Sequence, residues 1–95
     1  MSDPAARLAE LRRRFIERSR ARRSDLARAA AEEDAAELRI VAHGFAGSGA
    51  IFGFRDVSDA GAALEQAVDA GTGWEELRRL IALLLERLDA MEVGQ

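Results

Sequence analysis

The chain has 95 residues and a formal net charge of −3, which fits one small domain rather than a two-lobed enzyme. It contains no cysteine, so disulfides, thiolate metal sites and a cysteine nucleophile are excluded. No apolar run approaches the roughly 20 residues that span a bilayer, and no signal-peptide pattern opens the chain. We therefore expect a cytoplasmic protein with no membrane contact.

The charge is unevenly distributed along the chain. All fourteen basic residues are arginine, and nine of them lie in the first thirty residues against four acids, so this segment carries +5 and the remainder −8. A basic segment can bind nucleic acid. A solvent-facing helix rich in arginine explains the same pattern, and we expect no nucleic-acid partner.

The first predicted helix covers about residues 4–31. Asp3 followed by Pro4 is typical of a helix start, because the carboxylate caps free amides and proline presets the first turn. Apolar side chains then recur at helical spacing: Leu8, Leu11, Phe15, Ile16, Leu26, Ala29 and Ala30. Ser19 and Arg22 interrupt this stripe, which indicates either a bend or a first half that runs past the core.

The second predicted helix covers about residues 35–52, and Asp34 can cap it. Its apolar positions keep helical spacing: Leu38, Ala42, Phe45, Gly49 and Phe52. Gly44, Gly47 and Gly49 would together cost such a helix about 2–3 kcal/mol relative to alanine. We expect the compensation to be space for a second backbone or for another protein.

The third predicted helix covers about residues 55–70, between a break at Gly53 and a terminating Gly71. Thr72 and Glu75 match a capping box, which predicts the start of a fourth helix over about 73–91. Four amphipathic helices with short links predict an all-α, antiparallel up-down-up-down bundle. We expect one domain over residues 1–95, and the initial Met and short tails favour a free-standing protein.

Residues 38–49 could instead form a strand and a glycine-rich loop, as in α/β-hydrolases or phosphate-binding loops. A hydrolase of that kind needs a G-x-S-x-G elbow, an acid and a second histidine in a large sheet, and this sequence supplies no such set. A Walker-type loop needs a lysine, and the chain has none. The helical interpretation is favoured.

On the predicted helix, His43 lies about 100° from the apolar stripe and therefore faces solvent or the shoulder of the bundle. Arg39 lies one turn before it and adds positive charge. A neutral imidazole is a nucleophile, and a carboxylate on the adjoining helix could orient it through its other nitrogen.

The run from His43 to Phe54, HGFAGSGAIFGF, followed by Leu64 and Glu65, resembles the signature of histidine-containing phosphotransfer (HPt) domains. It is also similar to the phosphotransfer domain of chemotaxis-type histidine kinases. The resemblance is close over residues 38–65, and the rest agrees as a helical pattern. It implies an all-α bundle whose exposed histidine accepts phosphate from a receiver-domain aspartate and passes it to another receiver.

By this resemblance His43 is the phosphoacceptor and Glu65 orients its ring. Ala46 replaces the lysine usual in the family, which makes Arg39 the candidate for offsetting the phosphate charge. The resemblance further implies that Gly47 leaves room for the partner and that Gly53 permits the turn. We expect Ile40, Ala46, Gly47 and Ala50 to contact the partner. Phe45, Ser48 and Gly53 are expected to be structural residues of the motif.

These observations lead us to expect a monomeric phosphorelay intermediate without kinase or hydrolase activity of its own. It would hold no metal or cofactor, and the Mg²⁺ used in transfer would belong to the partner receiver domain. A hybrid histidine kinase or a response regulator would be the partner. Ala46 motivates an alternative, a receiver-binding adaptor or inhibitor that docks response regulators without efficient phosphotransfer.

Overall fold

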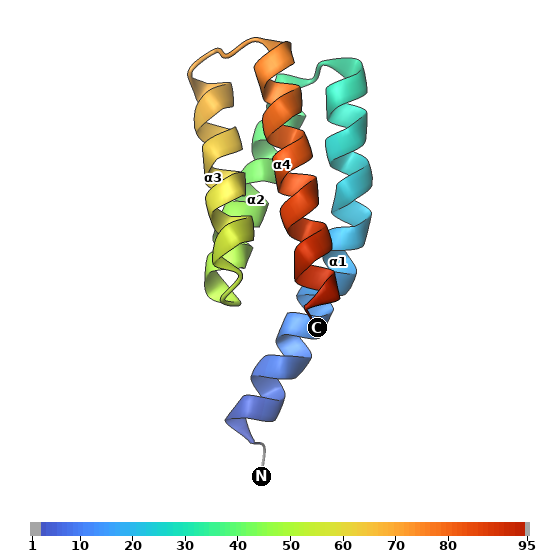
Figure 1. Ribbon diagram of the computed structural model, residues 1–95, viewed down its shortest axis with the longest axis vertical. Coiled ribbons are helices and arrows are strands. Elements are labelled where there is room, and N and C mark those ends of the chain that lie inside the picture. Colours follow the sequence, from blue (N-terminus) through green and yellow to red (C-terminus); the bar gives the residue numbers. More distant parts are fainter. Residues whose placement is uncertain (1–2, 95) are drawn as a thin grey trace.

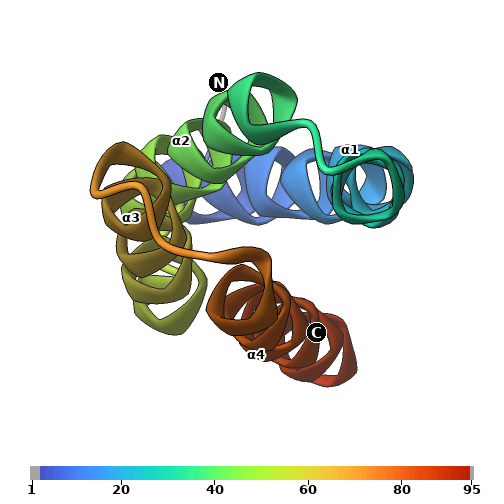
Figure 2. The ribbon, with the colours of Figure 1, turned by 90° about the horizontal axis from the view of Figure 1, so that it is seen from above.

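A computed structural model describes residues 3–94 and folds them into four α-helices, with no strand in that range. The helices are α1 (Pro4–Glu32), α2 (Ala35–Ile51), α3 (Arg55–Asp69) and α4 (Trp74–Val93). They run alternately up and down and form a ring in which α4 closes against α1 (Figures 1 and 2). The predicted all-α antiparallel bundle is confirmed, and residues 1, 2 and 95 of the expected domain lie outside the described range.

Helix α1 is much longer than its neighbours. Its 29 residues span roughly 44 Å at 1.5 Å per residue, whereas the 15 residues of α3 span roughly 22 Å. Its first buried residue is Phe15, and Leu8 is exposed. At the interruption of the stripe, Ser19 is buried and its hydroxyl donates to the Ile16 carbonyl at 2.6 Å. The helix is continuous there, and only the residues before Phe15 run past the core, where Figure 1 shows the start of α1 projecting below the bundle.

The core is one apolar cluster to which all four helices contribute. Its most completely buried large side chains are Leu26, Leu38, Val57, Leu64, Leu84 and Leu88. Helix α2 adds Val41, Ala42 and Phe45 to the same cluster. Because these residues share one side of α2, the opposite side, which carries His43, is left to solvent.

Two tight turns, between α2 and α3 and between α3 and α4, depend on glycine, and the first of them packs against α1. Gly53 and Gly71 adopt φ values of +81° and +74°, in the left-handed region that side chains with a Cβ rarely occupy. The Phe15 ring stacks on Phe52 and Phe54, with centroid distances of 5.4 and 5.7 Å. The turn between α2 and α3 is therefore held against the middle of α1.

The predicted capping box at Thr72 is wrong. Helix α4 begins at Trp74 with Gly73 as its N-cap, and no side-chain hydrogen bond caps it. The Thr72 amide instead donates to the Ala67 carbonyl at 3.1 Å, while the Gly71 amide donates to Val68 at 3.0 Å. These two bonds close a Schellman motif. Thr72 therefore belongs to the C-terminal cap of α3. It precedes Gly73, the N-cap of α4, and does not cap that helix.

Candidate functional site

The site centres on an imidazole and a carboxylate from adjacent helices. His43 on α2 is 71% exposed, and its Nδ1 lies 2.8 Å from Oε2 of Glu65 on α3, whose side chain is 17% exposed. A carboxylate only accepts hydrogen bonds, so the Nδ1–H of a neutral His43 ring donates to it. Nε2 then carries the free lone pair, which makes it the nucleophilic nitrogen.

A second pair lies one turn away on the same two helices. Nε of Arg39 donates to Oδ1 of Asp69 at 2.7 Å, and its Nη2 lies 3.5 Å from both Asp69 Oδ2 and Glu65 Oε2. The hydrogen bond and the charge of Asp69 raise the pKa of Arg39 above its usual value; burial opposes this rise, and the charge of Glu65 adds to it. Arg39 is therefore a permanent cation beside the His43–Glu65 pair.

The four side chains form two neighbouring pairs between the antiparallel helices α2 and α3, Arg39 with Asp69 and His43 with Glu65. Arg39 and His43 are four residues apart on α2, as are Glu65 and Asp69 on α3, so each pair lies on one helical face. Sequence analysis missed Asp69. The available signal was its position one turn after Glu65, which becomes informative once α2 and α3 are known to pair in this register.

Very close helix packing fixes that register. A Cβ built on Gly49 would lie 2.8 Å from the Ser58 amide nitrogen, and one on Gly61 would lie 2.8 Å from the Ala46 amide nitrogen. The Ser58 hydroxyl also donates to the Ala46 carbonyl at 2.7 Å. Ala46, expected to contact a partner, thus lies half-buried at the junction of α2 and α3.

The outer face of α2 is apolar and open around His43. Ile40 is 59% exposed and Ile51 is 74% exposed, and Gly47 and Ala50 lie between them on the surface. A Cβ built on Gly44 or Gly47 would meet no atom within 4 Å. These two glycines therefore leave free surface, whereas Gly49 accommodates α3. Sequence analysis did not single out Ile51, although its place one turn after Gly47 put it on the same face.

A groove of about 520 Å³ borders this face on the side of α1. Phe15, Val41 and the predicted structural residues Phe45 and Ser48 line it, together with Ile40 and Gly44 from the exposed face. Arg18, Arg22 and Asp25 stand on its α1 side, where Arg22 pairs with Asp25 at 3.0 Å. The exposed face of α2 therefore continues into a concave surface that has charged side chains of both signs on its α1 side.

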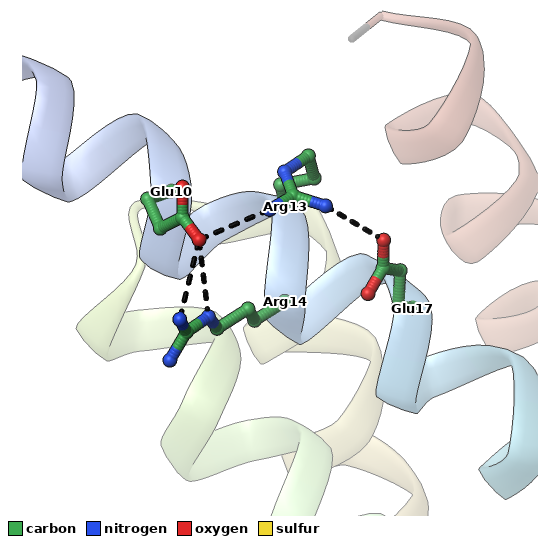
Figure 3. Close-up of polar contacts among 4 residues, drawn as sticks. All are labelled: Glu10, Arg13, Arg14 and Glu17. Atoms are coloured by element: carbon green, nitrogen blue, oxygen red, sulfur yellow. Dashed lines mark hydrogen bonds and ion pairs between the residues drawn. The ribbon is translucent and has the colours of Figure 1, made fainter.

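The arginines of α1 are largely engaged with carboxylates of the same chain. Figure 3 shows Arg13 between Glu10 and Glu17, at 3.0 and 2.9 Å, and Arg14 on Glu10 at 3.2 Å. Similar ion pairs involve Arg20, Arg22, Arg23 and Arg28. These contacts fit the interpretation of the basic segment as a solvated helix face.

No group of three or more histidine and carboxylate side chains within residues 3–94 is arranged to hold a metal ion. None of the helices in that range is long and apolar enough to cross a membrane.

A comparison with protein-family models matches residues 10–92 to the Hpt domain. Comparisons with curated proteins and with solved structures give no match. The matched segment begins within α1 and ends within α4, so it includes every element that carries the site. The chain therefore belongs to the Hpt domain family, whose members act in histidine phosphotransfer and work with receiver domains and histidine kinases.

Proposed function

We propose that this chain is a phosphorelay intermediate in which His43 accepts a phosphoryl group from a receiver-domain aspartate and passes it to a second receiver. The observation that carries this proposal is the hydrogen bond of 2.8 Å between His43 Nδ1 and Glu65 Oε2 on an otherwise exposed ring. It assigns the proton to Nδ1 and the lone pair to Nε2 before any partner arrives.

In the transfer step, the Nε2 lone pair forms a bond to phosphorus while the acyl phosphate P–O bond breaks. The electron pair of that bond returns to the aspartate as a carboxylate. The ring becomes an imidazolium whose Nδ1–H stays beside Glu65, and the charge of that carboxylate favours the cationic ring. The reverse sequence loads the second receiver, whose own Mg²⁺ would stabilise the transferring group.

Arg39 is the proposed source of positive charge for the phosphorylated state. It lies one turn from His43 and stays charged, whereas Ala46 offers no charge where the family usually has lysine. Its present bonds to Asp69 are solvent-exposed, so a phosphoryl group, which carries more negative charge than the Asp69 carboxylate, can draw the guanidinium away. A phosphoryl group on His43 would compete with Asp69 for it.

The proposed docking surface is the apolar face formed by Ile40, Gly47, Ala50 and Ile51, extended by the groove against α1. Open glycines let a partner backbone approach the His43 ring, and transfer requires the two reacting atoms to come close together. Further parts of the proposal are a single domain over residues 1–95, a monomeric state and a cytoplasmic location.

The test is phosphate label on His43 after the chain is mixed with a phosphorylated cognate receiver. Because the chain has one histidine, an acid-labile and base-stable label can be assigned to His43 alone. We expect His43→Gln to lose it and Glu65→Gln to gain it more slowly. Label that survives in His43→Gln would refute the assignment.

A receiver-binding adaptor is the second candidate, favoured by Ala46 in place of lysine. An adaptor would bind the same receivers through the α2 face without turning over phosphate. Binding that persists in His43→Ala, combined with no transfer by the wild type, would select this function.

A further inference from the structure

One oxygen of Glu65 has two competing donors on α2. His43 Nδ1 lies 2.8 Å from Oε2, and Arg39 Nη2 lies 3.5 Å from the same atom. A guanidinium forms bidentate, charge-assisted bonds to a carboxylate, which are stronger than a bond from a neutral imidazole. Left to itself, Arg39 would therefore be the preferred partner of Glu65.

Asp69 prevents that pairing because it binds the guanidinium of Arg39 itself. Its Oδ1 accepts from Arg39 Nε at 2.7 Å, and its Oδ2 lies 3.5 Å from Nη2. Glu65 and Asp69 are one turn apart on α3, so the guanidinium lies between two carboxylates and is drawn toward the outer one. The contact to Glu65 stays long while the contact to Asp69 is short.

We propose that Asp69 is a positioning residue that holds Arg39 away from Glu65 and so keeps His43 in the tautomer protonated at Nδ1. The contribution of Asp69 to phosphotransfer rests on the proposed function, but its effect on the His43 tautomer does not. Arg39 and Asp69 are both about half exposed, and exposed pairs of this kind add little stability. Loss of Asp69 is therefore expected to change the position of the guanidinium without a large loss of stability.

The test measures the His43 tautomer directly, by ¹⁵N NMR of the ring in alkaline solution where the imidazole is neutral. Wild type is expected to hold the proton mainly on Nδ1. Asp69→Asn frees Arg39 to pair with Glu65, and the Nδ1–H fraction should fall toward that of free histidine. The double variant Arg39→Gln/Asp69→Asn removes the competitor and should restore the wild-type fraction.

Two further variants calibrate the measurement. Glu65→Ala removes the acceptor and sets the lower limit of the Nδ1–H fraction. Asp59→Asn neutralises an exposed carboxylate elsewhere on α3 and should leave the fraction unchanged. Thermal unfolding of Asp69→Asn should match that of Asp59→Asn, which separates ring control from a loss of structure.

An unchanged tautomer in Asp69→Asn would overturn the proposal, and so would a double variant that fails to restore it. Transfer rates measured on the same samples address the proposed function separately. If His43 is the phosphoacceptor, Asp69→Asn should transfer more slowly, in proportion to the fall in the Nδ1–H fraction, because only that tautomer has its lone pair on Nε2. A tautomer change without any transfer by wild type would uphold the role of Asp69 and refute the phosphorelay function.

Discussion

Gly61 on α3 packs against the backbone of Ala46 on α2 so closely that a Cβ at position 61 would lie 2.8 Å from the Ala46 amide nitrogen and 2.9 Å from the Ala42 carbonyl oxygen. Backbone atoms of a helix cannot move aside as a flexible side chain can. This contact therefore fixes the distance between the helices that carry His43 and Glu65.

Gly61→Ala is expected to destabilise the protein despite the higher helix propensity of alanine. Overpacking of a tight core contact costs typically about 1–3 kcal/mol, which exceeds the propensity gain of about 1 kcal/mol. Denaturant unfolding measures the change. Gly44→Ala is the matched control, because its Cβ would meet no atom within 4 Å, and it should be neutral or stabilising. Equal stability changes in the two variants would contradict the packing argument.

Gly47→Ala should separate stability from function. The position is helical and a Cβ there meets no atom within 4 Å, so stability should rise by about 0.5–1 kcal/mol. If the α2 face docks a receiver, the added methyl group should weaken receiver binding and slow transfer. Titration calorimetry with a cognate receiver measures the binding. A more stable variant with unchanged affinity and transfer rate would remove Gly47 from the docking surface.

Ala46→Lys should restore the charge that is usual in the family. An ammonium near the His43 ring would stabilise the negative charge of the transferring phosphoryl group by roughly 1 kcal/mol, because surface charges interact weakly through water, so transfer should quicken about three- to tenfold. Rapid-quench measurements test this, with Ala46→Gln as the uncharged control. A slower Ala46→Lys with a normal Ala46→Gln would indicate that the new cation competes with His43 for Glu65.

Glu92 on α4 accepts hydrogen bonds from two arginines of α1, at 2.6 Å from Arg20 Nε and 2.6 Å from Arg23 Nη2. Glu92→Gln should lower the thermal midpoint, because it removes one of the two carboxylates, with Asp89, by which α4 pairs with arginines of α1. The loss should shrink at 1 M salt, where the screening length falls to about 3 Å. Glu86→Gln, at an exposed position on the same helix, should have little effect. A loss independent of salt would show that packing, and not charge, links α1 to α4 here.

The helices and the bundle could be predicted because local signals agreed with one another. The Asp3 and Asp34 caps form the expected bonds, to the amides of Ala5 at 3.0 Å and Glu37 at 3.1 Å. The 3.6-residue period also predicted the solvent exposure of His43, since its angular position followed from the apolar residues of α2. One wrong cap shows the limit of local patterns: the Thr72 amide was already engaged by the preceding helix.

Features that depend on two helices together could not be predicted in the same way. The helical period placed Gly49 on the apolar stripe and Gly47 away from it, but it did not predict that Gly49 faces the backbone of Ser58 on α3. Asp69 could not be distinguished from other exposed acids until α3 was placed beside Arg39. Such relationships arise from the register between helices, which no single helix encodes.

The decisive experiment is phosphotransfer from a panel of receiver domains charged with acetyl phosphate, run on wild type and His43→Gln side by side. We expect rapid loss of phosphate from at least one receiver, with label appearing on wild type and none on His43→Gln. Binding to a receiver without transfer would select the adaptor function instead. The absence of both binding and transfer across a full cognate panel would contradict the proposed phosphorelay function.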